Sequence, residues 1–108
     1  MDEGKLQRQI RKELEQTIGG LWFKTHGGPY STEGVSDIIG CFAGKFIAFE
    51  VKLPGKEKTL TRLQQKFIDK VIAQGGVAGM VTSFHDCILL ISKAFHTEVT
   101  VGVEDEGE

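Results

Sequence analysis

Three residues near the middle of the chain have types and a spacing that could do chemistry: Asp37, Glu50 and Lys52. Glu50 and Lys52 lie in a run, 45–53, whose composition predicts a β-strand. Side chains two positions apart in a strand share a face, so the carboxylate and the ammonium group should lie side by side. Asp37 begins a second predicted strand, 37–42, and should reach the same surface across a hairpin.

Such a surface suits metal-assisted hydrolysis of a phosphodiester bond. Two converging carboxylates are a typical beginning of a Mg²⁺ site, which carbonyl, water and phosphate oxygens complete. The metal can activate a water and neutralise charge on the phosphate, and Lys52 can orient that water or stabilise the transition state. Glu-x-Lys alone is common on exposed strand faces, where it would be a solvated ion pair, and Asp37 could be a turn residue.

Regular elements surround these residues. An apolar residue recurs every four positions near the N-terminus, which predicts a helix that Gly19-Gly20 ends: Leu6, Ile10, Leu14 and Ile18. A short strand, 21–26, and a loop rich in turn formers, 27–34, follow. Ala43-Gly44 provides a short turn between the two central strands.

The second half of the chain predicts a helix, a strand and an ambiguous segment. The helix, 60–74, has an apolar face that consists of Leu63, Phe67, Ile68, Val71 and Ile72. A buried strand, 77–82, follows. Ser83 as N-cap, with Asp86 three residues on, would then start a helix, although 87–91 is also compatible with a strand. We expect a helix from Ser83 to about Phe95 and a short strand near 99–103.

Composition indicates one globular domain. The 108 residues fit a single domain, which we place at 1–103, with 104–108 as an acidic tail. Without the four acidic residues of that tail, the chain has thirteen basic and eleven acidic residues. This slight positive charge is compatible with DNA binding but does not indicate it.

The cysteines and aromatic residues are expected in the interior. Cys41 and Cys87 lie in apolar runs and form no Cys-x-x-Cys pair, so we expect buried free thiols. Trp22 and the seven phenylalanines should mostly be core. No stretch is long and apolar enough to span a membrane and the N-terminus lacks a signal-peptide pattern, so we expect a cytoplasmic protein without a membrane partner.

Longer motifs contain the three chemical residues. They are 34–40 (Gly-Val-Ser-Asp-Ile-Ile-Gly), 44–52 (Gly-Lys-Phe-Ile-Ala-Phe-Glu-Val-Lys), 60–64 (Leu-Thr-Arg-Leu-Gln) and 75–76 (Gly-Gly). In this order the motifs resemble the VRR-NUC family of the PD-(D/E)XK nuclease superfamily, and more closely its small stand-alone members from phages and bacteria. The resemblance extends from the first helix to about Thr82. Ser36 departs from it, because the motif's name has proline there, a residue that shapes the backbone and performs no chemistry.

The resemblance implies a fold and a set of site residues. The fold is α/β, a restriction-endonuclease-like αβββαβ core with a mixed central sheet flanked by helices. Asp37, Glu50 and the backbone carbonyl of Val51 would be metal ligands, and Lys52 the catalytic lysine. The cofactor would be Mg²⁺, with Mn²⁺ able to substitute, in the cytoplasm of a bacterium or of a phage-infected host.

Two further positions match the family motif, and each has a second interpretation. Glu3 resembles a glutamate at the start of the family's first helix that helps to build the metal site, but the helix dipole alone would favour a carboxylate there. Gln64 matches a helix glutamine near the active site and is a catalytic candidate. It could instead complete a capping box with Thr61. We expect that one amide cannot play both roles, and we favour the active site.

The loop before Asp37 offers candidate nucleic-acid contacts. Lys24, His26 and Tyr30 could contact phosphate or stack on an exposed base, although ordinary loop polarity would also explain them. The expected function is a metal-dependent, structure-selective DNA endonuclease acting on branched, flap or Holliday-junction DNA. A homodimer would supply the two sites that symmetric cutting needs. The alternatives are a non-catalytic DNA-binding module with this fold and a restriction-type subunit that needs a partner.

Overall fold

The computed structural model describes residues 1–26 and 33–106, with side chains only as far as Phe95. One mixed sheet contains four strands in the order β1-β2-β3-β4. The strands are β1 (Leu21–Lys24), β2 (Ile38–Phe42), β3 (Lys45–Val51) and β4 (Val77–Val81). β2 pairs with β1 and β3 in antiparallel fashion, whereas β3 and β4 are parallel.

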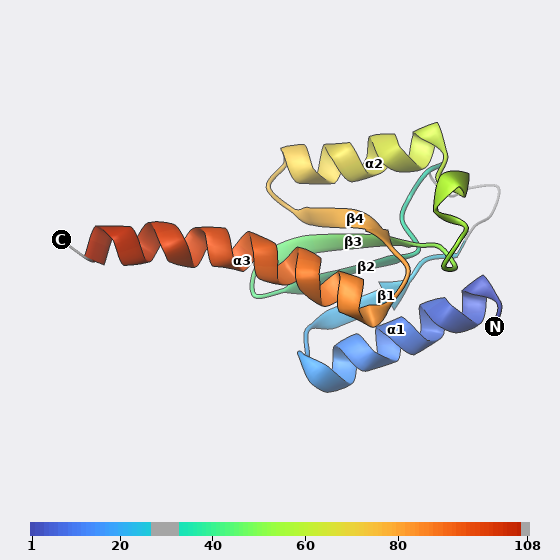
Figure 1. Ribbon diagram of the computed structural model, residues 1–108, viewed down its shortest axis with the longest axis horizontal. Helices are drawn as coiled ribbons and strands as arrows, with labels where there is room; N and C mark the ends of the chain where they lie inside the picture. Colours follow the sequence, from blue (N-terminus) through green and yellow to red (C-terminus); the bar gives the residue numbers. More distant parts are fainter. Residues whose placement is uncertain (27–32, 107–108) are drawn as a thin grey trace.

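Helices cover both faces of this sheet (Figure 1). They are α1 (Glu3–Thr17), α2 (Arg62–Ala73) and α3 (Phe84–Glu106), with a short 3-10 turn, η1 (Glu57–Thr59), before α2. The chain is therefore an α/β protein, and the predicted order of its first six elements is confirmed. None of the helices in the described part of the chain combines the length and apolarity needed to cross a membrane.

The alternation of side chains along β3 decides which helix covers which face. Ile47, Phe49 and Val51 point into one buried cluster together with apolar residues of α1 and α3. Ala48 points the other way and packs against Ile68 of α2. Because alternate residues share a face, Glu50 lies on the α2 side of the sheet.

The β2–β3 hairpin has the turn that the sequence predicts. Phe42 pairs with Lys45, and the two residues between them, Ala43 and Gly44, have φ angles of 50° and 83°. Positive φ at both central positions is the backbone of a type I′ turn, whose twist matches that of the flanking strands. The turn sets the register that carries Asp37 towards Glu50.

The C-terminal segment is partly different from expectation. The predicted helix is confirmed as α3. At its start Ser83 Oγ accepts the Asp86 N–H at 3.1 Å, and Asp86 Oδ2 accepts the Thr82 N–H at 2.9 Å. The predicted strand at 99–103 is wrong, since α3 continues through these residues to Glu106. A strand needs a neighbour to satisfy its backbone groups, and a continuing helix satisfies them within the segment.

Several residues expected in the core are exposed. Leu63 and Ile72 on α2 are 47% and 52% exposed, and Phe23 and Phe46 on the sheet are 54% and 46% exposed. Cys41 is exposed as well, although Cys87 is buried as predicted. For Phe23 and Cys41 the reason is coverage: α2 packs on β3 and β4, so this one helix leaves the same face of β1 and β2 open.

Chain direction brings many element ends together at one edge of the sheet, on the right in Figure 1. β1, β3 and β4 end at this edge, and α1, α2 and α3 begin near it. The chain also enters β2 there, directly after Asp37. Residues distant in sequence therefore meet at this edge, which carries the candidate site.

Candidate functional site

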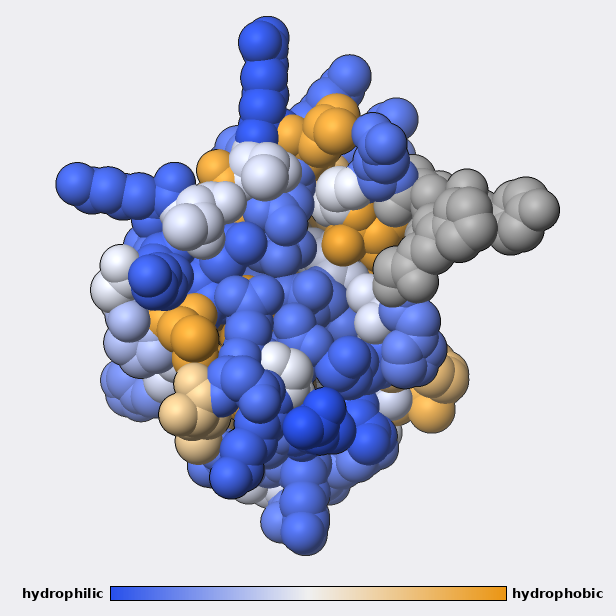
Figure 2. Space-filling view, turned by 90° about the vertical axis from the view of Figure 1, so that its right-hand side faces the viewer, coloured by the Kyte–Doolittle hydropathy of each residue, from blue (hydrophilic) through white to orange (hydrophobic). Residues whose placement is uncertain are grey.

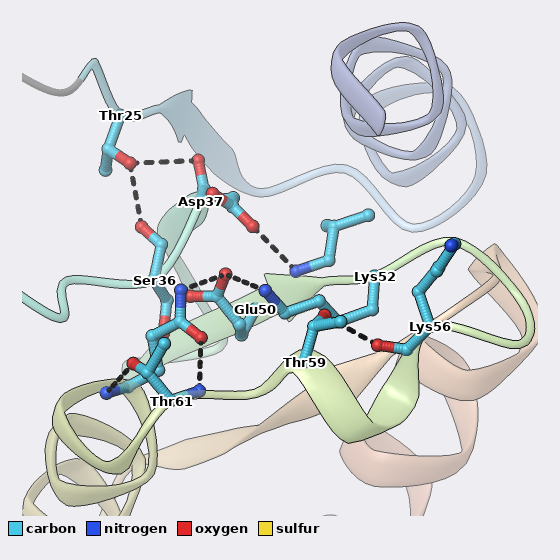
Figure 3. A network of polar contacts seen from close by, with 10 residues as sticks. Thr25, Ser36, Asp37, Glu50, Lys52, Lys56, Thr59 and Thr61 are labelled. Carbon is cyan, nitrogen blue, oxygen red and sulfur yellow. Dashed lines mark hydrogen bonds and ion pairs between the residues drawn. The ribbon is translucent and has the colours of Figure 1, made fainter. Parts of the chain in front are cut away.

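Asp37 lies where the antiparallel pairing of β2 and β3 opens. The partner of Ile38 is Phe49, so Asp37 stands opposite Glu50 one position further on. Asp37 Oδ2 accepts the backbone N–H of Val51 at 2.8 Å (Figure 3). β2 begins only at Ile38 and leaves this amide without a ladder partner, so the carboxylate satisfies it. The Asp37 carboxylate is thereby held against the end of β3.

Thr25 holds the backbone of Asp37 from the other side. The Thr25 N–H donates to the Asp37 carbonyl at 2.8 Å, and Thr25 Oγ1 donates to the Ser36 carbonyl at 2.8 Å. These contacts tie the segment after β1 to the start of β2. Sequence reasoning missed Thr25, whose only signal was a hydroxyl near the end of a predicted strand.

Glu50 is a buried carboxyl group with one oxygen in use. It is 2% exposed. Its Oε2 accepts a hydrogen bond from Gln64 Nε2 at 3.2 Å and lies 3.9 Å from Lys52 Nζ. Its Oε1 is buried and has no hydrogen-bond partner within the described ranges. A buried polar atom without a partner costs free energy, which marks Oε1 as a position suited to a ligand.

Burial and a neighbouring carboxylate perturb Glu50. Burial is the main cause that raises its pKa from 4.5 to about 9, followed by the neighbouring Asp37 carboxylate. Lys52 lowers this pKa, and Glu3 raises it through its charge. Without a cation, burial and the Asp37 carboxylate therefore favour the protonated form of Glu50.

Gln64 plays both of the roles that the sequence analysis treated as exclusive. Its Oε1 accepts the Thr61 N–H at 2.9 Å while Thr61 Oγ1 accepts the Gln64 N–H at 3.1 Å, which completes the capping box of α2. The Nε2 end donates to Glu50. The expectation of exclusive roles was wrong because an amide has an acceptor end and a donor end that can serve different partners. The cap thus positions a contact to Glu50.

Lys52 is buried beside Glu50 rather than on a solvated surface. It is 7% exposed, and its backbone N–H donates to the Val81 carbonyl at 2.9 Å. That bond extends the pairing of β3 with β4 by one residue and fixes where the side chain starts. The Lys52 ammonium group is therefore held close to the Glu50 carboxyl group.

The carboxylates suit a hard divalent cation. Mg²⁺ binds through one or two carboxylates, with waters and phosphate oxygens as its other ligands. The described residues contain no group of three or more His, Cys, Asp and Glu side chains that could hold a metal. Positive charge between Asp37 and Glu50 would offset their repulsion and use the free Oε1.

The remaining candidates lie around this centre. Glu3 is the first residue of α1 and is half-buried, and its charge reaches Glu50. Lys24 ends β1, and His26 is exposed two residues later. These two flank Thr25, next to the start of β2. Tyr30 lies outside the described residues.

Comparison with models of known protein families finds no match to this chain. A search of curated proteins finds no match either.

Proposed function

We propose that this protein is a Mg²⁺-dependent endonuclease that hydrolyses DNA phosphodiester bonds, with a restriction-endonuclease-like core of the VRR-NUC kind. One observation carries the proposal: Glu50 is buried with a free oxygen, opposite Asp37 and in contact with Lys52. The order of elements and the mixed sheet are those that the family resemblance implies. Support therefore comes from site geometry and sequence motifs together.

Each residue has a role that follows from its contacts. Asp37 and Glu50 would hold the metal, with the Val51 carbonyl as a third ligand. When bound, Mg²⁺, or Mn²⁺ in its place, supplies water activation and charge neutralisation at the phosphate. Lys52, already desolvated, stabilises the additional negative charge of the transition state. Gln64 is a positioning residue that fixes Glu50 through Oε2 and leaves Oε1 free.

The proposed substrates are branched, flap or Holliday-junction DNA. The described site is a small surface at one edge of the sheet, and each chain has one copy of Asp37, Glu50 and Lys52. Symmetric cutting of two strands would need two such sites, which a two-fold homodimer provides. The dimer and the preference for branched DNA are part of the proposal.

The first experiment measures cleavage of labelled linear, flap and four-way DNA in Mg²⁺, Mn²⁺ and EDTA. We expect metal-dependent cutting by the wild type, and a loss of ~10²–10³-fold or more in Asp37→Ala and Lys52→Ala. Gln64→Ala should lose ~10–100-fold, because it acts only through Glu50.

Matched controls separate the site from general effects on the fold. Asp69→Ala and Gln65→Ala alter exposed residues of α2 that contact each other, and both should cut like the wild type. No cutting by folded wild type on any DNA, with binding intact, would overturn catalysis and favour a binding module. Cutting that appears only after a partner subunit is added would favour the restriction-type alternative.

A further inference from the structure

The connection between β3 and α2 returns to the candidate site at both ends. It leaves from Lys52, whose Nζ lies 3.9 Å from Glu50 Oε2, and reaches Gln64, whose Nε2 lies 3.2 Å from the same oxygen. We call residues 53–62, which lead from β3 into the first residue of α2, the basic connection. Figure 3 shows Lys56, Thr59 and Thr61 of this segment beside the site residues. Both ends of the segment are therefore held next to Glu50.

The basic connection has an ordered backbone although its surface is exposed. The Lys56 N–H donates to the Leu53 carbonyl at 2.9 Å, and the Thr59 N–H donates to the Lys56 carbonyl at 2.9 Å. Thr59 Oγ1 donates to the same carbonyl at 2.6 Å. Consecutive turns of this kind hold the backbone in place, so the side chains of the segment project from a fixed frame.

Positive charge is concentrated in this segment. It contains Lys56, Lys58 and Arg62 but only one acidic residue, Glu57. All four are exposed. Within the described residues none of the three basic side chains forms an ion pair, in contrast to Arg11, which pairs with Glu15. The segment thus presents cationic charge that local acids do not neutralise.

The start of α2 adds to this positive charge. The amino end of a helix carries partial positive charge, and α2 has no acidic residue in its first turn, whereas α1 begins with Glu3 and α3 has Asp86 there. The face of the molecule seen at this edge of the sheet is largely hydrophilic and bears long polar side chains that project outward (Figure 2).

We propose that the basic connection is a phosphate-backbone clamp. It binds phosphates of the DNA strand that neighbour the phosphate at which the strand is cut. Lys56, Lys58 and Arg62 contact non-reacting phosphates and read no bases, because phosphate contacts position the DNA and carry no sequence information. This inference rests on the proposed nuclease function and identifies how its substrate is held. It assigns the connection a role separate from that of Asp37, Glu50 and Lys52.

The test measures DNA affinity in EDTA by fluorescence anisotropy over a series of KCl concentrations, using a labelled linear duplex and a labelled four-way junction. Lys56→Gln/Lys58→Gln should weaken binding to both DNAs by a similar factor, about tenfold at low salt. The slope of log affinity against log salt should become shallower by about one per lost phosphate contact. In Mg²⁺, KM should rise and kcat should stay unchanged.

The matched control, Lys12→Gln/Lys70→Gln, removes the same charge from exposed positions further along α1 and α2. It should keep the wild-type slope, as should Lys56→Arg/Lys58→Arg. An unchanged slope in Lys56→Gln/Lys58→Gln, or an equal loss in the control, would overturn the clamp even if the wild type cuts DNA. A reduced slope in a protein that never cuts would leave the clamp standing and refute the nuclease.

Discussion

Glu50 is costly to bury and is placed where a ligand could use it. In the absence of a cation, burial and the Asp37 carboxylate favour its protonated form, with a pKa of about 9 against an ordinary 4.5. Gln64 and Lys52 occupy one oxygen and leave the other without a partner. Such a residue lowers the stability of the metal-free protein. Losses of stability of this kind are common at functional sites.

This argument predicts how stability depends on pH. Between about pH 5 and pH 9 the folded protein binds a proton at Glu50 that the unfolded chain releases, so the free energy of unfolding in EDTA should fall as pH rises. Glu50→Gln should remove this part of the slope and be more stable than the wild type at pH 8 by ~1–3 kcal/mol. Urea unfolding at several pH values measures both effects.

Mg²⁺ should reverse the trend in the wild type. Because a metal binds the deprotonated carboxylate, stabilisation by Mg²⁺ should grow with pH and be absent in Glu50→Gln. Glu57→Gln, which changes an exposed acid on η1, is the control and should follow the wild type. If Glu50→Gln is less stable than the wild type at pH 8 in EDTA, burial of the Glu50 carboxyl group does not destabilise the metal-free protein, and this explanation is wrong.

Among the elements, the β2–β3 hairpin has the clearest conflict between residue and conformation. Ala43 has a φ of 50° in the turn, a left-handed conformation that costs an alanine about 1 kcal/mol. Asparagine adopts this conformation readily, and Asn-Gly is the preferred pair of a type I′ turn. The turn lies at the opposite end of β3 from Glu50, so it can be altered without touching the site.

Ala43→Asn should therefore raise the free energy of unfolding by ~0.5–1 kcal/mol. Ala43→Val, with a β-branched side chain at positive φ, should lower it. Urea unfolding compares the two variants, and DNA cleavage by Ala43→Asn should equal that of the wild type. A lower stability in Ala43→Asn would show that the hairpin does not depend on a type I′ turn.

In the molecule as a whole, one edge of the sheet collects three helix starts and the ends of three strands (Figure 1). This arrangement places the carboxylates, Lys52 and the basic connection on one side, so each chain has a single proposed site. A protein that cuts both strands of a branched DNA would then work as a pair of chains.

The dimer can be tested by mass and by mixing. Sedimentation should give twice the chain mass with and without four-way DNA, and a strict monomer in both conditions would exclude the dimer. Wild type mixed with excess Lys52→Ala should produce dimers with one working site, which nick one strand. If mixed dimers form and the share of nicks does not rise, the two sites of a dimer do not cut together.

Much of the fold was predictable because its signals are local. The four-residue period of Leu6, Ile10 and Leu14 identifies α1, and these three side chains are buried. Ala43-Gly44 identifies the hairpin, and the two-residue period of β3 places Glu50 and Lys52 on one face. Each of these depends on backbone geometry within a few residues, which the sequence of that segment specifies.

Contacts between distant segments were decided only by the tertiary structure. Thr25 bonds the backbone of Asp37, and Gln64 serves the helix cap and Glu50 together. Leu63 has the pattern of a core residue but is 47% exposed, because coverage depends on what α2 packs against. The periodicity of a segment shows which of its residues share a face. Whether that face is buried depends on which other segments pack against it, and this is determined only when the chain folds.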